Sequence, residues 1–86
     1  MSFVLLGTDG CHLCEDAAAI IVVAADGLAV TVYSEDIIDI DGGVDRYGLR
    51  IPVLRDEQTG TELDWPFSEG DVRKLFQISG QDTAND

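Results

Sequence analysis

The fold is decided near the front of the chain, by residues 3–27, FVLLGTDGCHLCEDAAAIIVVAADG. The apolar run Phe3 to Leu6 stops at a glycine and predicts a short, buried strand. Apolar residues then recur at spacings of three and four, which predicts a helix over Cys11 to Ala25. The buried face of this helix is expected to consist of Leu13, Ala17, Ile20, Ile21 and Ala24. A strand therefore leads directly into a helix.

The only two cysteines of the chain, Cys11 and Cys14, stand at the start of this helix. Residues three apart in a helical turn have Cα atoms roughly 5–5.5 Å apart. A disulfide accepts Cα separations of about 4.4–6.8 Å, so the two cysteines can be bridged without moving the backbone. The loop that the bridge closes is very short, so the bridge adds little stability. This combination suits a disulfide that forms and breaks reversibly.

The start of a helix also favours a reactive thiol. Its free N–H groups and partial positive charge lower the pKa of a cysteine placed there, and Thr8 or Asp9 is the expected N-cap. Cys11 lies nearer the helix start and is predicted to be the attacking thiolate. Cys14 lies one turn in and is predicted to be the resolving thiol.

His12 separates the cysteines and is a candidate for tuning the pKa or the redox potential of the pair. A protonated imidazole beside the thiolate would favour the reduced state. The carboxylates of Asp9, Glu15 and Asp16 would act in the opposite direction. His12 can also be an exposed residue of the first turn without a role, and the sequence leaves both interpretations open.

The rest of the chain predicts five further elements. We expect a strand over 29–33, a short helix over 40–47, strands over 51–56 and 61–65 joined by a turn, and a last helix within 66–79. The order is β-α-β-α-β-β-α. This order fits an α/β fold in which a four-stranded mixed sheet is flanked by helices on both faces.

The last helix has a clear predicted start. Ser68 and Asp71 have the spacing of a capping box, and Phe67 and Val72 that of a hydrophobic staple. Gly80 is expected to end the helix. We therefore expect one domain over residues 1–79 and a polar, disordered tail over 80–86.

Composition narrows the possible partners. The chain has 86 residues, which suits a single domain, and a formal net charge of -12. This acidity argues against nucleic acid and against anionic membrane surfaces. The longest apolar run, residues 17–25, is too short to span a membrane, and no basic region precedes the apolar N-terminus. We expect a cytoplasmic monomer, where paired cysteines indicate redox or metal chemistry.

Several segments together resemble a known family. They are Gly-Cys-His-Leu-Cys at 10–14, Arg-Tyr-Gly at 46–48 and Pro-Val-Leu-Arg at 52–55. Over residues 3–79 the chain resembles small glutaredoxin-like proteins of the thioredoxin fold. The resemblance implies that Pro52 is a cis-proline facing the cysteines. It also implies that the backbone of Ile51 pairs with an extended substrate chain.

The chain departs from glutaredoxins where these bind glutathione. Thr8 and Asp9 stand where a basic residue is usual, and residues 65–71, WPFSEGD, replace the usual Gly-Gly and acidic residue. These departures argue against glutathione binding. We expect no cofactor besides the redox-active disulfide, and glutathione stays open as the reductant.

The predicted function is a thiol–disulfide oxidoreductase that acts on a disulfide-containing protein or a small thiol substrate. One alternative is metal or iron–sulfur cluster binding through Cys11 and Cys14. Two cysteines are too few for a closed site in one chain, so no metal site is assigned. Another alternative is a non-enzymatic module that binds a partner through its acidic surface. Trp65 and Tyr47 are weaker candidates for lining the active-site groove.

Overall fold

The computed structural model describes the backbone of residues 1–84 and the side chains of residues 1–78. The elements, in order, are β1 (Ser2–Gly7), α1 (His12–Ala24), β2 (Thr31–Asp36), the 3-10 helix η1 (Ile37–Asp39), α2 (Gly43–Tyr47), β3 (Val53–Asp56), β4 (Glu62–Asp64) and α3 (Glu69–Ala84). This order confirms the predicted β-α-β-α-β-β-α arrangement, with η1 as an addition.

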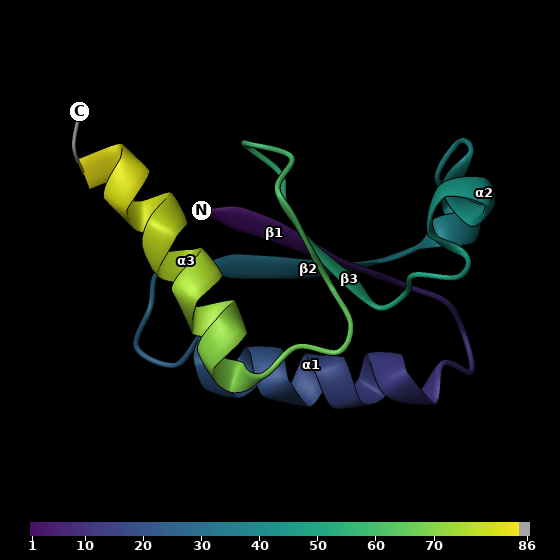
Figure 1. Cartoon of the computed structure of the whole chain (residues 1–86), viewed down its shortest axis with the longest axis horizontal. Coiled ribbons are helices and arrows are strands. Elements are labelled where there is room, and N and C mark those ends of the chain that lie inside the picture. The colour runs from purple at the N-terminus through teal and green to yellow at the C-terminus, as the bar shows by residue number, and fades with distance from the viewer. Residues whose placement is uncertain (85–86) are drawn as a thin grey trace.

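The four strands form one mixed sheet in the order β2-β1-β3-β4. β1 pairs with β2 in parallel, as a strand–helix–strand crossover requires, while β3 is antiparallel to both β1 and β4. Figure 1 shows α1 and α3 together on one side of the sheet and α2 at the opposite corner. The predicted mixed sheet with helices on both faces is therefore confirmed.

The apolar run of β1 is continuous because both faces of this central strand are buried. Phe3 and Leu5 point into a core shared with α1 and α3. Val4 and Leu6 point into a second, smaller core with Tyr47 of α2. Side chains alternate along a strand, so one short segment supplies both cores.

Helix α1 buries most of its predicted face. Ala17, Ile21 and Ala24 lie in the core with α3, whereas Leu13 is 48% exposed. The prediction that Leu13 is buried is wrong. Leu13 belongs to the first turn of α1, which also carries Cys14.

Two predicted elements between α1 and β3 need correction. The second strand runs over 31–36 instead of 29–33, because the polar residues Ser34, Glu35 and Asp36 pair with β1 along an exposed edge of the sheet. The predicted helix over 40–47 is replaced by η1 and a shorter α2. A turn separates them, in which Gly42 adopts a positive φ of 71° at the N-cap of α2.

Helix α3 begins as predicted. The backbone N–H of Asp71 donates to the Ser68 hydroxyl at 3.1 Å, and the Ser68 N–H donates to the Asp71 carboxylate at 3.0 Å. This reciprocal pair is a capping box, and the flanking Phe67 and Val72 are both buried. The prediction that the helix ends at Gly80 is wrong, because α3 continues to Ala84.

The predicted tail over 80–86 therefore begins inside α3, and its last two residues lie outside the part of the chain that the structure describes. Within residues 1–84, no helix has the length and apolar content needed to cross a bilayer.

Candidate active site

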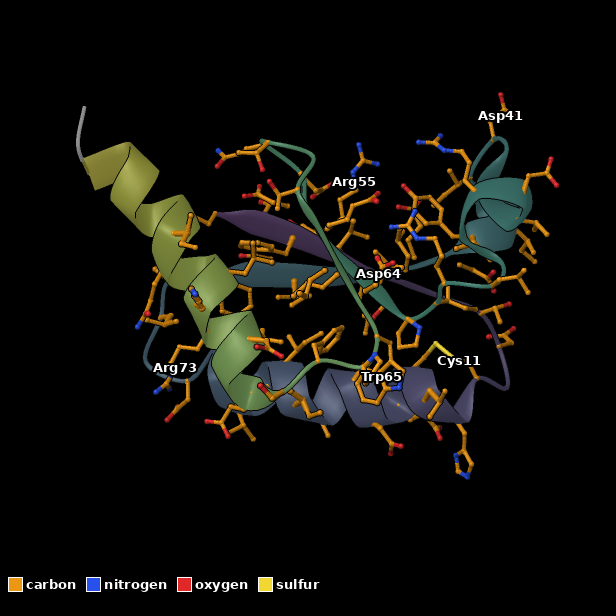
Figure 2. All side chains as sticks on the ribbon, viewed as in Figure 1. Cys11, Asp41, Arg55, Asp64, Trp65 and Arg73 are labelled. Atoms are coloured by element: carbon orange, nitrogen blue, oxygen red, sulfur yellow. A yellow bond between two sulfur atoms is a disulfide. The ribbon has the colours of Figure 1, made fainter. Side chains whose placement is uncertain are left out.

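Cys11 and Cys14 form a disulfide at the N-terminal end of α1, with their Cα atoms 5.2 Å apart (Figure 2). Cys11 is itself the N-cap of the helix, in place of the predicted Thr8 or Asp9. Its sulfur accepts a hydrogen bond from the backbone N–H of Cys14 at 3.1 Å. The sulfur of Cys11 thus occupies the position where the free N–H groups of a helix point.

Cys14 lies on the inner side of the pair, against β1. A Cβ added at Gly7 would stand 2.8 Å from the Cys14 sulfur and 3.3 Å from its Cβ. Only a residue without a side chain leaves room for this sulfur. Gly7 ends the central strand, so the disulfide rests directly on the end of the sheet.

Pro52 stands at the same end of the sheet. The pairing of β1 with β3 matches Leu6 with Val53, and one further step places Pro52 opposite Gly7. The Ile51–Pro52 peptide bond is cis, which confirms the isomer that the family resemblance implied. Pro52 itself is almost fully buried.

The backbone of Ile51 is only partly available to a substrate. Its N–H donates to the carbonyl of Tyr47 at 3.0 Å. Its carbonyl oxygen accepts no hydrogen bond from residues 1–84. On the other side, the Trp65 N–H donates to the Pro52 carbonyl at 3.2 Å, which ties this segment to the end of β4.

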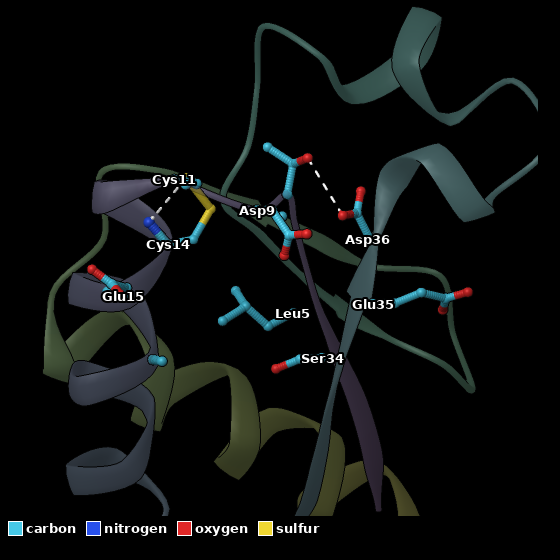
Figure 3. A pocket seen from close by; sticks show the side chains of 12 residues that line it. Leu5, Asp9, Cys11, Cys14, Glu15, Ser34, Glu35 and Asp36 are labelled. Atoms are coloured by element: carbon cyan, nitrogen blue, oxygen red, sulfur yellow. Dashed lines mark hydrogen bonds between the residues drawn. A yellow bond between two sulfur atoms is a disulfide. The ribbon is translucent and has the colours of Figure 1, made fainter.

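A pocket of about 380 Å³ opens beside the disulfide (Figure 3). Its lining comes from the end of β1, the loop that follows, the first turns of α1 and the end of β2. The lining residues are Leu5, Gly7, Thr8, Asp9, Gly10, Cys11, Cys14, Glu15, Ala18, Ser34, Glu35 and Asp36. The predicted site residues Cys11 and Cys14 are in this set, whereas His12, Ile51 and Pro52 are not.

His12 does not line the pocket. Its side chain is 94% exposed, and its ring nitrogen Nδ1 lies 3.4 Å from the Glu15 carboxylate, one turn along α1. Any effect of His12 on the cysteines therefore acts through charge rather than through contact.

On the opposite face of the sheet, a group of charged residues ties the segment before Pro52 to β4. Arg50 donates to the carboxylates of Glu62 and Asp64, each at 2.7 Å from Nη2. The buried Tyr47 donates its hydroxyl to Glu62 at 2.6 Å. The guanidinium groups of Arg46 and Arg50 lie 5.5 and 5.2 Å from the centre of the Tyr47 ring.

These contacts shift the pKa values of the groups that they join. The hydrogen bonds from Tyr47 and Arg50 hold the pKa of Glu62 below its ordinary value. The hydrogen bond from Arg50 does the same to the pKa of Asp64. The hydrogen bond to Glu62, together with burial, raises the pKa of Tyr47.

Three parts of the site were not predicted from the sequence. Gly7 was read only as the end of a strand, and Asp36 and Arg50 were given no place in the site. The second cis peptide bond, Trp65–Pro66, also had no signal beyond the proline itself.

The two weaker candidates for lining the active site lie elsewhere than in the pocket beside the disulfide. Tyr47 is buried in the core, and Trp65 packs edge-to-face against Phe67.

Within the described part of the chain, no three or more His, Cys, Asp or Glu side chains are grouped so that they could hold a metal ion.

Comparison with known proteins agrees with this geometry. The profile of a family described as a glutaredoxin-like domain (DUF836) matches residues 2–77. The crystal structure of the structural-genomics target protein XcR50 from X. campestris is 38% identical, with a TM-score of 0.75, and the match covers 88% of this chain and 96% of that one. The solution structure of the same target is 39% identical, with a TM-score of 0.67, and the match covers 91% of this chain and 95% of that one.

Thioredoxin 1 from Thermosipho africanus TCF52B is 14% identical with a TM-score of 0.70 over the full length of both chains, which shows the fold alone. Among curated proteins, none is a significant match. The family profile covers most of the chain, the disulfide lies where a strand meets a helix, and the fold matches thioredoxin. The chain therefore belongs to the glutaredoxin-like domain family and has a thioredoxin-like fold.

Proposed function

We propose that the protein is a thiol–disulfide oxidoreductase in which Cys11 attacks and Cys14 resolves. The observation that carries this proposal is the hydrogen bond from the Cys14 N–H to the Cys11 sulfur, at a helix N-terminus beside an open pocket. In the reduced protein, the same N–H would stabilise a thiolate at Cys11. A thiolate is the nucleophile that disulfide exchange requires.

The reaction proceeds in two exchanges. The Cys11 thiolate attacks one sulfur of the substrate disulfide, the substrate S–S bond breaks, and the leaving thiolate takes up a proton. The Cys14 thiol then loses its proton and attacks the Cys11 sulfur. The second substrate thiol leaves, and the Cys11–Cys14 disulfide forms. Two electrons have passed from the protein dithiol to the substrate disulfide, and no cofactor besides the cysteines takes part.

The position of Cys14 supports its role as the resolving thiol. Its sulfur packs against Gly7, so the central strand covers one side of it. Resolution then needs only a short movement toward Cys11, one helical turn away.

The segment before β3 supplies a substrate-docking edge. Ile51 offers its carbonyl to an extended substrate backbone, while its N–H stays bonded to Tyr47. Pro52 fixes the direction of this segment. His12 takes part only as a nearby charge, since its exposed ring faces Glu15.

The proposed substrate is a disulfide-containing protein or a small disulfide. We place the protein as a monomer in the cytoplasm, where reduced thiols persist. Glutathione is one candidate for the physiological electron donor.

Two serine variants test the proposed roles, with wild type as the reference. The Cys14→Ser variant should accumulate a mixed disulfide on Cys11 when mixed with 2-hydroxyethyl disulfide. Mass spectrometry of peptides detects this adduct. The Cys11→Ser variant should lose disulfide-reducing activity, and undiminished activity in that variant would refute the proposal.

A further inference from the structure

The mouth of the disulfide pocket carries an excess of negative charge. Asp9, on the loop after β1, and Asp36, at the end of β2, present their carboxylates toward one another (Figure 3). The disulfide lies on the other side of Asp9 in the same view. Glu15 and Glu35 stand further out on the rim.

Among the described residues, Glu15 lies 3.4 Å from the His12 ring nitrogen, whereas Asp9 and Asp36 have no basic partner. Asp36 accepts hydrogen bonds from the Thr8 hydroxyl at 3.5 Å and from the Ile38 N–H at 3.1 Å. Both donors are neutral. Over residues 1–84, neither Asp9 nor Asp36 has a Lys, Arg or His side chain within ion-pair distance. The charge at the pocket mouth is therefore open to a ligand.

The basic residues of the chain lie elsewhere. Arg46 and Arg50 contact the Tyr47 ring on the opposite face of the sheet. Arg73 lies on α3, at the far end of the molecule from Cys11 (Figure 2). None of the five basic side chains, Arg46, Arg50, Arg55, Arg73 and Lys74, lines the pocket. The negative electrostatic potential at the pocket thus comes from its own carboxylates as well as from the net negative charge of the whole chain.

We propose that Asp9 and Asp36 make this site selective for disulfides that carry a positive charge beside the sulfur. This inference rests on the proposed redox function and concerns its substrate class. A lysine or arginine next to a disulfide cysteine would place its charged end among the carboxylates while the sulfur meets Cys11. A pocket of about 380 Å³ falls within the size range of small-ligand sites and can take a basic side chain.

The chemical step is unchanged by this selectivity. Two electrons still pass from the Cys11–Cys14 dithiol to the substrate disulfide, and each substrate sulfur leaves as a thiol. The carboxylates affect only how fast a substrate disulfide approaches the site and how tightly it binds there. An anionic disulfide is repelled by the same groups.

The test compares three small disulfides of nearly equal length. Cystamine is cationic, 2-hydroxyethyl disulfide is neutral and 3,3′-dithiodipropionate is anionic. The full chain is reduced and desalted, and the rate of formation of the Cys11–Cys14 disulfide is followed at low salt by acid quench and mass spectrometry. Each rate is divided by that of dithiothreitol with the same compound, which removes differences in intrinsic reactivity.

The expected order is cationic, then neutral, then anionic. An opposite charge at about 4 Å in water changes an equilibrium roughly fivefold, so the Asp9→Asn/Asp36→Asn double variant should lose about tenfold or more of the cation-to-anion rate ratio. Asparagine keeps the capping geometry at Asp36, so the variant is expected to fold.

The Glu57→Gln variant is the matched control. Its N–H bonds to Ser2, at the end of the sheet opposite to the pocket, and the substitution removes one negative charge there. Its rate ratio should stay close to that of wild type. If the loss per charge removed were as large as in the Asp9→Asn/Asp36→Asn double variant, only the net charge of the chain would matter, and the inference would be overturned.

Failure of the inference and failure of the proposed function are distinguishable. If the reduced protein reacts with none of the three compounds, the redox function fails. If it reacts with all three at equal normalised rates, the function stands and the charge selectivity is refuted.

Disulfide-linked peptides with lysine or glutamate beside the cysteine extend the test to polypeptides. The lysine peptide should react faster in wild type and lose this advantage in the double variant. If only the small compounds show the preference, the positively charged substrate of this site is not a basic polypeptide.

Discussion

Gly7 and Cys14 are in such close contact that a Cβ at Gly7 would stand 2.8 Å from the cysteine sulfur. The resolving thiol of the proposed mechanism is thus packed on the backbone of the central strand. This contact makes Gly7 part of the site, although it has no functional group of its own.

The Gly7→Ala variant should be destabilised in its oxidised form. The added methyl group overpacks a site where the sulfur is held by the disulfide, and overpacking typically costs about 1–3 kcal/mol. In the reduced form the free Cys14 side chain can rotate, so the cost there should be smaller. Urea unfolding of both forms measures the difference, and the reduction potential should become less negative.

Gly70→Ala is the matched control for Gly7→Ala. Gly70 lies in the first turn of α3, and an added Cβ would make only an ordinary contact of 3.7 Å with the Ser68 hydroxyl oxygen. This variant should be stabilised by about 0.5–1 kcal/mol, because alanine is the better helix former. If Gly7→Ala raised the urea midpoint in the same way, the packing contact would be disproved.

The hydrogen bond between Tyr47 and Glu62 can be tested by titration. The chain has two tyrosines, so in a Tyr33→Phe background the ultraviolet absorbance of tyrosinate reports Tyr47 alone. The pKa of Tyr47 is raised mainly by its hydrogen bond to Glu62, and Glu62→Gln should lower it toward the ordinary value. An unchanged titration curve would contradict the assigned bond.

The ion pairs of Arg50 predict a dependence of stability on pH. The pKa values of Glu62 and Asp64 are lowered in the folded state, so the unfolded chain takes up protons first as the pH falls. The stabilisation is complete above the ordinary values of about 4.3 and 3.9 and is lost as the pH falls through the lower folded values.

The gap in free energy of unfolding between wild type and Arg50→Gln should therefore be constant above about pH 6 and shrink below about pH 4. Urea unfolding at several pH values measures it. Arg73→Gln, an exposed change on α3, is the control and should show no such trend. A difference in free energy of unfolding that grew as the pH fell would contradict the assigned ion pairs.

The capping box offers a test of the last helix. Ser68→Ala removes the acceptor for the Asp71 N–H and should cost about 1 kcal/mol. Ser68→Asp keeps an N-cap acceptor and should recover most of the loss. Equal stability of the alanine variant and wild type would show that α3 does not depend on this cap.

The sequence predicted the elements whose signals are local. Buried strands and amphipathic helices show in the spacing of apolar residues, and the Ser68–Asp71 cap shows in four consecutive residues. The cysteine pair was predicted because helix geometry fixes the distance between Cys11 and Cys14. Each of these features depends on neighbours in the chain.

Features that depend on tertiary contacts were missed. The second strand was displaced because its polar half, Ser34 to Asp36, gains its strand conformation from pairing with β1. The role of Gly7 appears only when β1 and α1 meet, and that of Arg50 only when its segment meets β4. No spacing rule encodes these contacts.

The central claim is that Cys11 and Cys14 form a reversible redox couple. The most direct test is to equilibrate the full chain in glutathione and dithiothreitol buffers over a range of potentials and to measure the fraction of the Cys11–Cys14 disulfide by mass spectrometry. The account predicts a reversible two-electron transition within the range of known dithiol enzymes, roughly -270 to -120 mV. The absence of an intramolecular disulfide at every potential would contradict it.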